Sequence, residues 1–124
     1  MPGAVLIVDD SATMRKIIMR TIRTAGVMFQ VTHEASNGKE ALAKLQEGPV
    51  DLVLCDINMP EMNGMEFVKN ARQLPNCKDT MIVMVSTESS PELIEQVKAL
   101  GATAYISKPF TPERFKEVLA PLLN

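Results

Sequence analysis

The chain has 124 residues, of which 46% are hydrophobic, and a formal net charge of -2 at pH 7. Residues 1–124 therefore suit one domain that buries a core without a metal or a disulfide. A pI near 5.4 gives no basic footprint for a phosphate backbone, so we expect no contact with nucleic acid. No apolar run could span a bilayer, and residues 1–3 lack the features of a signal peptide. We expect a cytoplasmic protein without membrane contact.

Five apolar segments predict strands. The runs at residues 4–8 and 52–55 are continuous, which is typical of strands buried on both faces, and each ends in acid: Asp9 and Asp10 after the first, Asp56 after the second. The segment 27–34 predicts a weaker strand that suits a sheet edge. Residues 81–85 and 102–106 predict the fourth and fifth strands, which precede Ser86 and Lys108.

Apolar residues at spacings of three and four predict a helix after each strand. Ser11 can cap the first helix, which Gly26 ends, and Asn37-Gly38 predicts a turn before the second. The first helix runs from Ser11 to Gly26, and a short second helix precedes Gly48-Pro49. The third follows Gly64 and presents Met65, Val68 and Ala71 to the sheet until Pro75 and Asn76 break it. The fourth runs from Ser90-Pro91 to Gly101, and the last begins at Thr111-Pro112.

The basic residues Arg15, Lys16, Arg20 and Arg23 alternate with the apolar stripe of the first helix. A solvated helix face is the default interpretation of such a pattern. A docking surface for a kinase or a phosphatase is the alternative interpretation.

Five strands alternating with five helices predict an α/β fold, a doubly wound five-stranded parallel sheet with helices on both faces. The strand order 2-1-3-4-5 is common in this class and places the weak second strand at an edge. Strands one and three are then neighbours at the point where a ligand crevice opens, so Asp9, Asp10 and Asp56 converge. Each stretch alone is better explained as an ordinary capping loop, but two acidic strand ends side by side favour a site.

Three carboxylates in one crevice repel each other unless a cation or a proton compensates their charge. Carboxylates without clustered His or Cys suit Mg²⁺, so we expect that ion as the cofactor. Ser86 and Lys108 add a hydroxyl and an ammonium at the same sheet edge, and this set fits a phosphoryl group. A carboxylate nucleophile would then form an aspartyl-phosphate.

These motifs together resemble the receiver domain of two-component response regulators, and most closely the single-domain, CheY-like chemotaxis type. The resemblance covers essentially the whole chain, and the 2-1-3-4-5 order is the order that this family has. It is carried by Val8-Asp9-Asp10-Ser11, Asp56-Ile57-Asn58-Met59-Pro60, Met62-Asn63-Gly64, Ser86-Thr87-Glu88, and Tyr105-Ile106-Ser107-Lys108-Pro109-Phe110.

The resemblance implies a role for each matching residue. Asp56 matches the phosphoacceptor, Lys108 the phosphoryl-binding lysine, Ser86 the switch hydroxyl and Tyr105 the switch aromatic residue. The implied Mg²⁺ ligands are Asp10, the Asp56 carboxylate and the backbone carbonyl of Asn58, with Asp9 reaching the ion through water. The bond between Lys108 and Pro109 matches a cis peptide of the family.

The resemblance implies a phosphorylation switch that takes a phosphoryl group from a sensor histidine kinase and changes its binding to an output protein, such as a flagellar motor switch. We expect a monomer that catalyses its own modification but acts as a signalling module rather than an enzyme, with a phosphatase as a further partner. The alternative is a phosphorelay shuttle, which passes the group to a histidine phosphotransfer protein instead of losing it to water. A flavodoxin-type or phosphatase use of the architecture ranks lower.

One departure from the enteric chemotaxis proteins concerns the start of the fourth helix. Those proteins are lysine-rich there, whereas this chain reads Ser89-Ser90-Pro91-Glu92. This difference argues against the same contact with the motor.

Overall fold

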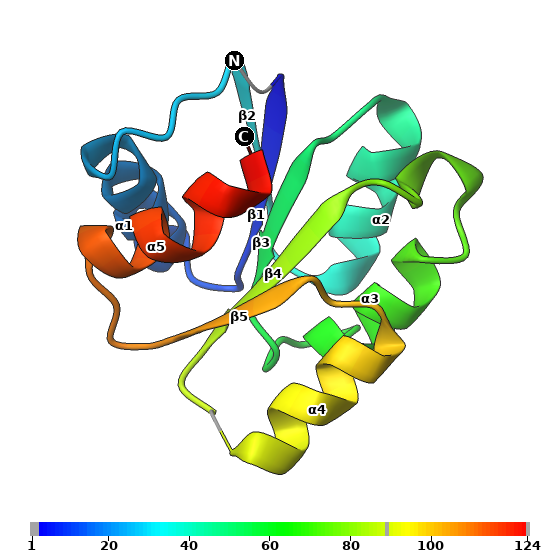
Figure 1. Cartoon of the computed structure of the whole chain (residues 1–124). Coiled ribbons are helices and arrows are strands. Elements are labelled where there is room, and N and C mark those ends of the chain that lie inside the picture. Colours follow the sequence, from blue (N-terminus) through cyan, green and yellow to red (C-terminus); the bar gives the residue numbers. More distant parts are fainter. Residues whose placement is uncertain (1–2, 89, 124) are drawn as a thin grey trace.

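Five parallel strands form a single sheet in the order β2-β1-β3-β4-β5, which confirms the predicted topology (Figure 1). The structure is a computed structural model, and it describes residues 3–88 and 90–123. The strands are β1 Ala4–Val8, β2 Val31–Ala35, β3 Leu52–Cys55, β4 Met81–Ser86 and β5 Ala104–Ser107. The three central strands are almost entirely buried, whereas β2 is largely exposed at its edge, as expected for these sequences.

Helices cover both faces of the sheet (Figure 1). They are α1 Ala12–Thr24, α2 Gly38–Glu47, α3 Gly64–Ala71, α4 Pro91–Leu100 and α5 Pro112–Leu123. Helices α1 and α5 pack together on one face, and α2, α3 and α4 form a continuous layer on the other. With a helical layer on each side of the sheet, the described part of the chain is a three-layer α/β structure.

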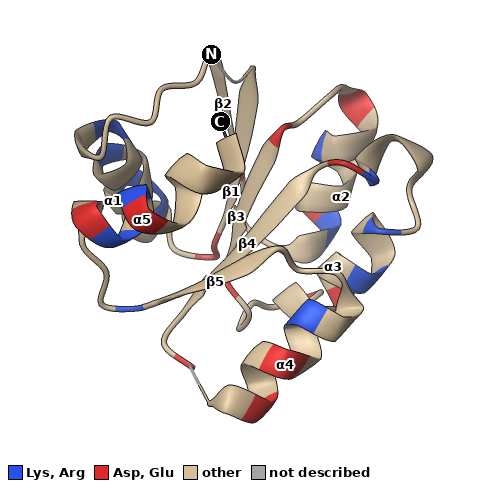
Figure 2. Cartoon of the chain, in the orientation of Figure 1, with Lys and Arg blue, Asp and Glu red and all other residues tan. Residues whose placement is uncertain are grey.

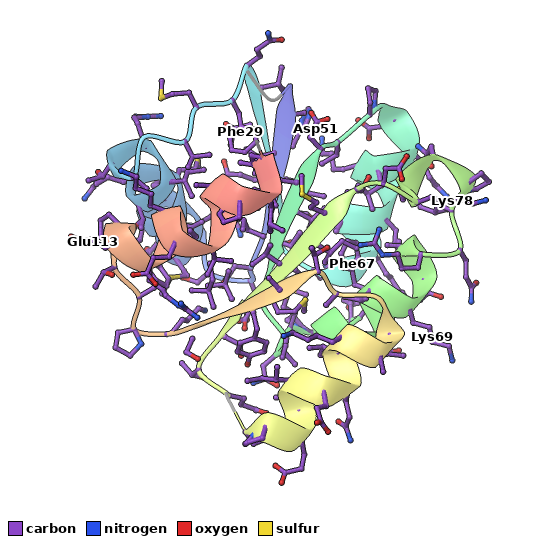
Figure 3. All side chains as sticks on the ribbon, viewed as in Figure 1. Phe29, Asp51, Phe67, Lys69, Lys78 and Glu113 are labelled. Carbon is purple, nitrogen blue, oxygen red and sulfur yellow. The ribbon has the colours of Figure 1, made fainter. Side chains whose placement is uncertain are left out.

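Each face of the sheet has its own apolar core. Phe115 of α5 lies with Ile18 and Ile22 of α1 in the first core, and Phe67 of α3 lies with Val97 of α4 in the second. Figure 3 shows Phe67 between α3 and the sheet, whereas Lys69 on the same helix extends outward. Alternate side chains of each central strand enter the two cores, and this explains why these strands read as unbroken apolar runs.

Two predicted strands begin later than expected. Strand β2 starts at Val31 instead of residue 27, because its partner β1 starts at Ala4, which pairs with Val31. Residues before Val31 therefore have no strand to pair with, and Phe29 packs against the α1 and α5 core from a loop. Strand β5 starts at Ala104 instead of residue 102, because the Ala102 amide donates to the Val97 carbonyl and closes the end of α4.

The structure adds detail to two local predictions on the second face and corrects a third. Asn37 lies in the bend between β2 and α2, and it also caps α2, since its side chain accepts a 2.9 Å hydrogen bond from the Glu40 amide. Helix α3 packs Met65, Val68 and Ala71 against this core as predicted, and it also buries Phe67 completely. Helix α3 ends at Ala71, before the break predicted at Pro75. Pro75 instead begins a 3-10 turn, Pro75–Cys77. Proline suits the first position of such a turn because it needs no amide donor there.

The register of the sheet determines which residues meet at its carboxyl edge. Val8 of β1 pairs with Cys55 of β3, so the acids that follow each strand emerge next to each other. Ser86 of β4 pairs with Ser107 of β5, and the Lys108 amide donates to the Ser86 carbonyl at 2.8 Å. No helix in residues 3–88 or 90–123 is long and apolar enough to cross a membrane.

Candidate functional site

Asp9, Asp10 and Asp56 converge at the carboxyl edge of β1 and β3. One carboxylate oxygen of each lies within 4.8 Å of the others, as the sequence predicts. Asp9 is only 2% exposed, Asp56 is partly buried and Asp10 is exposed. An all-oxygen set with an exposed member has the chemistry of a Mg²⁺ site, because that ion takes few protein oxygens and keeps several waters. The residues present therefore fit the implied ion.

Lys108 lies between two of these acids. Its Nζ atom is 3.1 Å from Oδ2 of Asp9 and 3.6 Å from Oδ2 of Asp56, and its side chain is 12% exposed. The structure thus brings the predicted lysine from the β5–α5 loop to the predicted phosphoacceptor. The peptide bond between Lys108 and Pro109 is cis, as the resemblance implies.

The Asp56 carboxylate has different partners for its two oxygens. Oδ1 accepts a 2.8 Å hydrogen bond from the Ile57 amide, and Oδ2 faces Lys108. Burial raises the pKa of Asp56, and the charge of Asp9 raises it further, while Lys108, the Ile57 amide and the nearby Ser86 hydroxyl act in the opposite direction. Burial and a like charge together outweigh the lysine, as expected for a carboxylate beside another carboxylate.

Ser86 of β4 and Tyr105 of β5 are diagonal neighbours in the sheet, since Tyr105 pairs with Met84, and they lie beside the acidic cluster. Ser86 is fully buried, and its Oγ accepts a long, 3.3 Å hydrogen bond from the Glu88 amide. Tyr105 is 8% exposed, so its ring already lies inward, and burial raises the pKa of its hydroxyl. The Ser86 hydroxyl is near enough to oppose that shift but not in hydrogen-bonding geometry, so the Tyr105 hydroxyl has no partner among the described residues.

Asn58 lies on the exposed β3–α3 loop, two residues after Asp56. Its backbone carbonyl accepts no hydrogen bond within the described residues, which leaves it available for the predicted ligand role. Its side-chain amide donates a 2.8 Å hydrogen bond to Oε1 of Glu88 on the β4–α4 loop. The sequence does not indicate this role of Glu88, because a contact between two exposed loops leaves no periodic pattern.

The basic face of α1 needs one correction. Lys16, Arg20 and Arg23 are exposed, as expected for a solvated face, but the Arg15 side chain is only 15% exposed. Arg15 donates to the Asp9 carbonyl and to the Glu34 carboxylate at the site's edge. These contacts depend on the pairing of β1 with β2, which residue spacing alone does not specify.

Comparison with known proteins assigns the family. A model of the response regulator receiver domain matches residues 5–120. The chain belongs to this receiver family. It is a CheY-like receiver, a component of two-component phosphorelay signalling. It is 42% identical over 121 residues to chemotaxis protein CheY1 of Helicobacter pylori, and the match covers 96% of this chain and 95% of that protein. It is also 44% identical to chemotaxis protein CheY of Thermotoga maritima, covering 93% of this chain and 92% of that protein.

Solved structures of receivers have the same fold. Chemotaxis response regulator CheY4 of Vibrio cholerae superimposes with a TM-score of 0.87 at 42% identity, covering 99% of this chain and all (100%) of that chain. The CheY of a CheX-CheY-BeF3-Mg²⁺ complex from Borrelia burgdorferi gives a TM-score of 0.86 at 28% identity, covering 100% of this chain and 92% of that chain. These matches confirm the α/β class and the sheet order.

Proposed function

We propose that this receiver is a phosphorylation switch that accepts a phosphoryl group on Asp56 from a sensor histidine kinase and thereby changes its affinity for a protein target. The observation that carries this proposal is the approach of Lys108 to Asp56, with Nζ 3.6 Å from Oδ2, beside two further acids at the sheet edge. A lysine next to a nucleophilic carboxylate suits a reaction in which negative charge is transferred as phosphate.

The reaction would proceed by attack of an ionised Asp56 oxygen on the phosphorus of a phosphohistidine. The P–N bond breaks, an O–P bond forms, and the imidazole that leaves takes up a proton. Oδ2 is the candidate nucleophile, because Oδ1 is engaged by the Ile57 amide. Lys108 would turn from Asp56 to the oxygens of the incoming group while its 3.1 Å contact with Asp9 keeps it in place.

Asp10, Asp56 and the Asn58 carbonyl would hold Mg²⁺, with Asp9 acting through water. A bound Mg²⁺ supplies positive charge to the phosphoryl oxygens during the transfer. The Borrelia burgdorferi CheY was solved in a complex with both Mg²⁺ and BeF3, a phosphoryl mimic, and this supports the assignment by similarity. The exposure of Asp10 leaves water access to the acidic cluster, as an ion that keeps part of its hydration requires.

Ser86 and Tyr105 are the candidate switch residues. The Ser86 hydroxyl is held only by a long contact with Glu88, so it can turn toward a new acceptor on Asp56. Because Tyr105 already lies inward, we expect its hydroxyl to gain a partner rather than its ring to swing in from solvent. The surface of α4, β5 and α5 would change in consequence, and a target that prefers the new surface would shift the population.

The proposed setting is chemotaxis-type signalling, in which the chain is a monomeric module that catalyses its own phosphorylation and dephosphorylation. The names of the CheY relatives support this setting. An output protein and a phosphatase are the expected partners besides the kinase. Ser89 lies outside the described residues, but Ser90 caps α4 and Glu92 lies in its first turn. Helix α4 carries acidic residues (Figure 2). This charge fits a different partner from one that binds a lysine-rich start of the helix.

The Asp10→Ala variant tests the metal part of this proposal. It should bind Mg²⁺ more weakly and lose Mg²⁺-dependent phosphotransfer while keeping its fold, and relief of carboxylate repulsion should keep or raise its thermal stability. Amide NMR measures the affinity. The exposed Asp79→Ala, with the same charge change before the amino end of β4, is the control and should bind as wild type. Unchanged affinity in Asp10→Ala would remove Asp10 from the site.

A further inference from the structure

Arg15 differs from the other basic residues of α1 in being held from two directions. Its Nη1 donates a 2.6 Å hydrogen bond to the Asp9 carbonyl, and its Nε donates a 2.8 Å hydrogen bond to Oε1 of Glu34 on β2. Its side chain is only 15% exposed, which leaves the guanidinium little freedom. A planar guanidinium can serve two acceptors in fixed directions at once, whereas an ammonium is a point donor.

The contact with Asp9 completes the hydrogen bonding of that residue. The Asp9 amide donates to the Ala35 carbonyl at 3.1 Å, Oδ1 accepts from the Ser11 amide at 2.9 Å, and Oδ2 faces Lys108 at 3.1 Å. Arg15 engages the remaining polar atom, the carbonyl oxygen. That carbonyl belongs to the peptide group that joins Asp9 to Asp10. Fixing its direction limits rotation of the peptide and therefore where the Asp10 carboxylate points.

We propose that Arg15 is a positioning residue for the Mg²⁺ site, acting through the peptide group between Asp9 and Asp10. This inference rests on the proposed function, since it concerns how the acidic cluster is presented to the ion. Asp10 is the exposed member of the cluster, so it has the least packing to restrain it. Removing a group that orients a metal ligand typically lowers metal affinity by about 10–100-fold.

Glu34 makes this arrangement compatible with cation binding. An unpaired guanidinium next to three carboxylates would turn toward them and compete with the ion, because opposite charges attract strongly in a partly buried site. Glu34 engages Nε from the β2 side and neutralises the charge, so Arg15 reaches the site only as a hydrogen-bond donor to a carbonyl. The edge strand β2 thereby supports a site that lies at the carboxyl ends of β1 and β3.

The decisive experiment replaces both partners, Arg15→Gln with Glu34→Gln, so that one positive and one negative charge are removed together. The net charge near the acids is unchanged, and any effect on Mg²⁺ reports the lost contact with the Asp9 carbonyl. The matched control is Lys44→Gln with Glu47→Gln, which removes an ion pair on α2. Mg²⁺ affinity is measured by amide NMR at fixed ionic strength. The Arg15 and Glu34 double variant should bind at least about tenfold more weakly than wild type, and the control should bind equally.

A second measurement separates positioning from general loosening of the structure. In metal-free protein the NMR signal of the Asp10 amide, which shares the peptide group with the Asp9 carbonyl, should shift between wild type and the double variant. The amide signals of the two cores should not shift. Arg15→Lys keeps the charge and serves if the double variant does not fold, and it should also weaken Mg²⁺ binding. A folded variant with wild-type Mg²⁺ affinity overturns this inference alone. Wild-type protein that binds no Mg²⁺ overturns the proposed function as well.

Discussion

The ammonium nitrogen of Lys108 lies 3.6 Å from Oδ2 of Asp56, and it reaches that carboxylate from the far side of β4. The same nitrogen is closer still, at 3.1 Å, to Oδ2 of the buried Asp9. Lys108 therefore places one positive charge between two acids that repel each other, and it lies where an incoming phosphoryl group would need a cation. The stability of this edge and its chemistry depend on the same side chain.

Replacing Lys108 with methionine should destabilise the protein at neutral pH. The buried Asp9 would lose the cation that pairs with it, so the free energy of unfolding should fall by about 2–3 kcal/mol, less than for a fully buried pair because Lys108 retains some solvent contact. Urea unfolding at pH 7 measures the change. Lys39→Met, which breaks an exposed pair with Glu61, is the control and should change stability by less than about 0.5 kcal/mol. Equal effects of the two variants would contradict this view of Lys108.

Asp56→Asn should stabilise the metal-free protein at neutral pH. Burial and Asp9 raise the pKa of Asp56 in the folded protein, so the folded state binds the proton more tightly than the unfolded state. Stability contributed by that group is then present at low pH and falls as pH rises from about 4 through the raised pKa. Asp56→Asn does not lose stability in this way. It should therefore be more stable than wild type above that pH window and equally stable below it.

Urea unfolding from pH 3 to pH 8 in the presence of a chelator measures this difference. Asp79→Asn serves as the control, because Asp79 is exposed whereas Asp56 is partly buried. A constant difference between Asp56→Asn and wild type across the pH range would show that Asp56 ionisation is not the cause.

Gly64→Ala should impair both stability and phosphorylation. A methyl group at this position would meet the carbonyl oxygen of Asp56, the Cα atom of Ile57 and the methyl group of Met84. Backbone atoms cannot move aside easily, so we expect a loss of about 1–3 kcal/mol and a displaced phosphoacceptor. Thermal unfolding and the rate of phosphorylation are measured together. Gly48→Ala, where a methyl group would meet nothing within 4 Å, should leave phosphorylation unchanged, and a similar loss there would refute the steric explanation.

Ser86→Ala should separate phosphorylation from its consequence. Asp56 keeps its nucleophile and its lysine, so phosphorylation should persist, but the coupling to target binding should weaken by about 1–3 kcal/mol. Wild type and variant are loaded with beryllofluoride, and their spectra over residues 90–110 and their affinity for a partner identified by pull-down are compared. Ser107→Ala, the exposed register partner of Ser86, is the control. Identical spectral shifts and affinity gains in Ser86→Ala would exclude the hydroxyl as the coupling element.

The sequence predicts the central sheet well for a physical reason. Strands β1 and β3 are buried on both faces, so their apolar runs begin and end with the strands themselves, and the acids Asp9 and Asp56 mark their ends. The edge strand β2 lacks this signal. Val27 and Phe29 look like strand residues but pack from a loop, and only the register with β1 determines that pairing starts at Val31.

The same limit applies to the site. Asp10, Asp56 and Lys108 stand out because each follows a strand, and parallel strands bring their carboxyl ends to one edge. The contact between Arg15 and Glu34 is not predicted, because it requires a helix and an edge strand to be placed relative to each other. The inward position of Tyr105 likewise depends on packing beneath α4 and not on residue spacing.

The central claim is that Asp56 is the phosphoacceptor of a Mg²⁺-dependent reaction, and locating the phosphoryl group by mass spectrometry tests it most directly. Wild type and Asp56→Asn are exposed to a small phosphodonor with and without Mg²⁺, digested and mapped. We expect one modified peptide, carrying the group on Asp56, only in wild type and only with Mg²⁺, because an amide is a far weaker nucleophile than a carboxylate. The same yield of modification at another residue in Asp56→Asn would contradict the account.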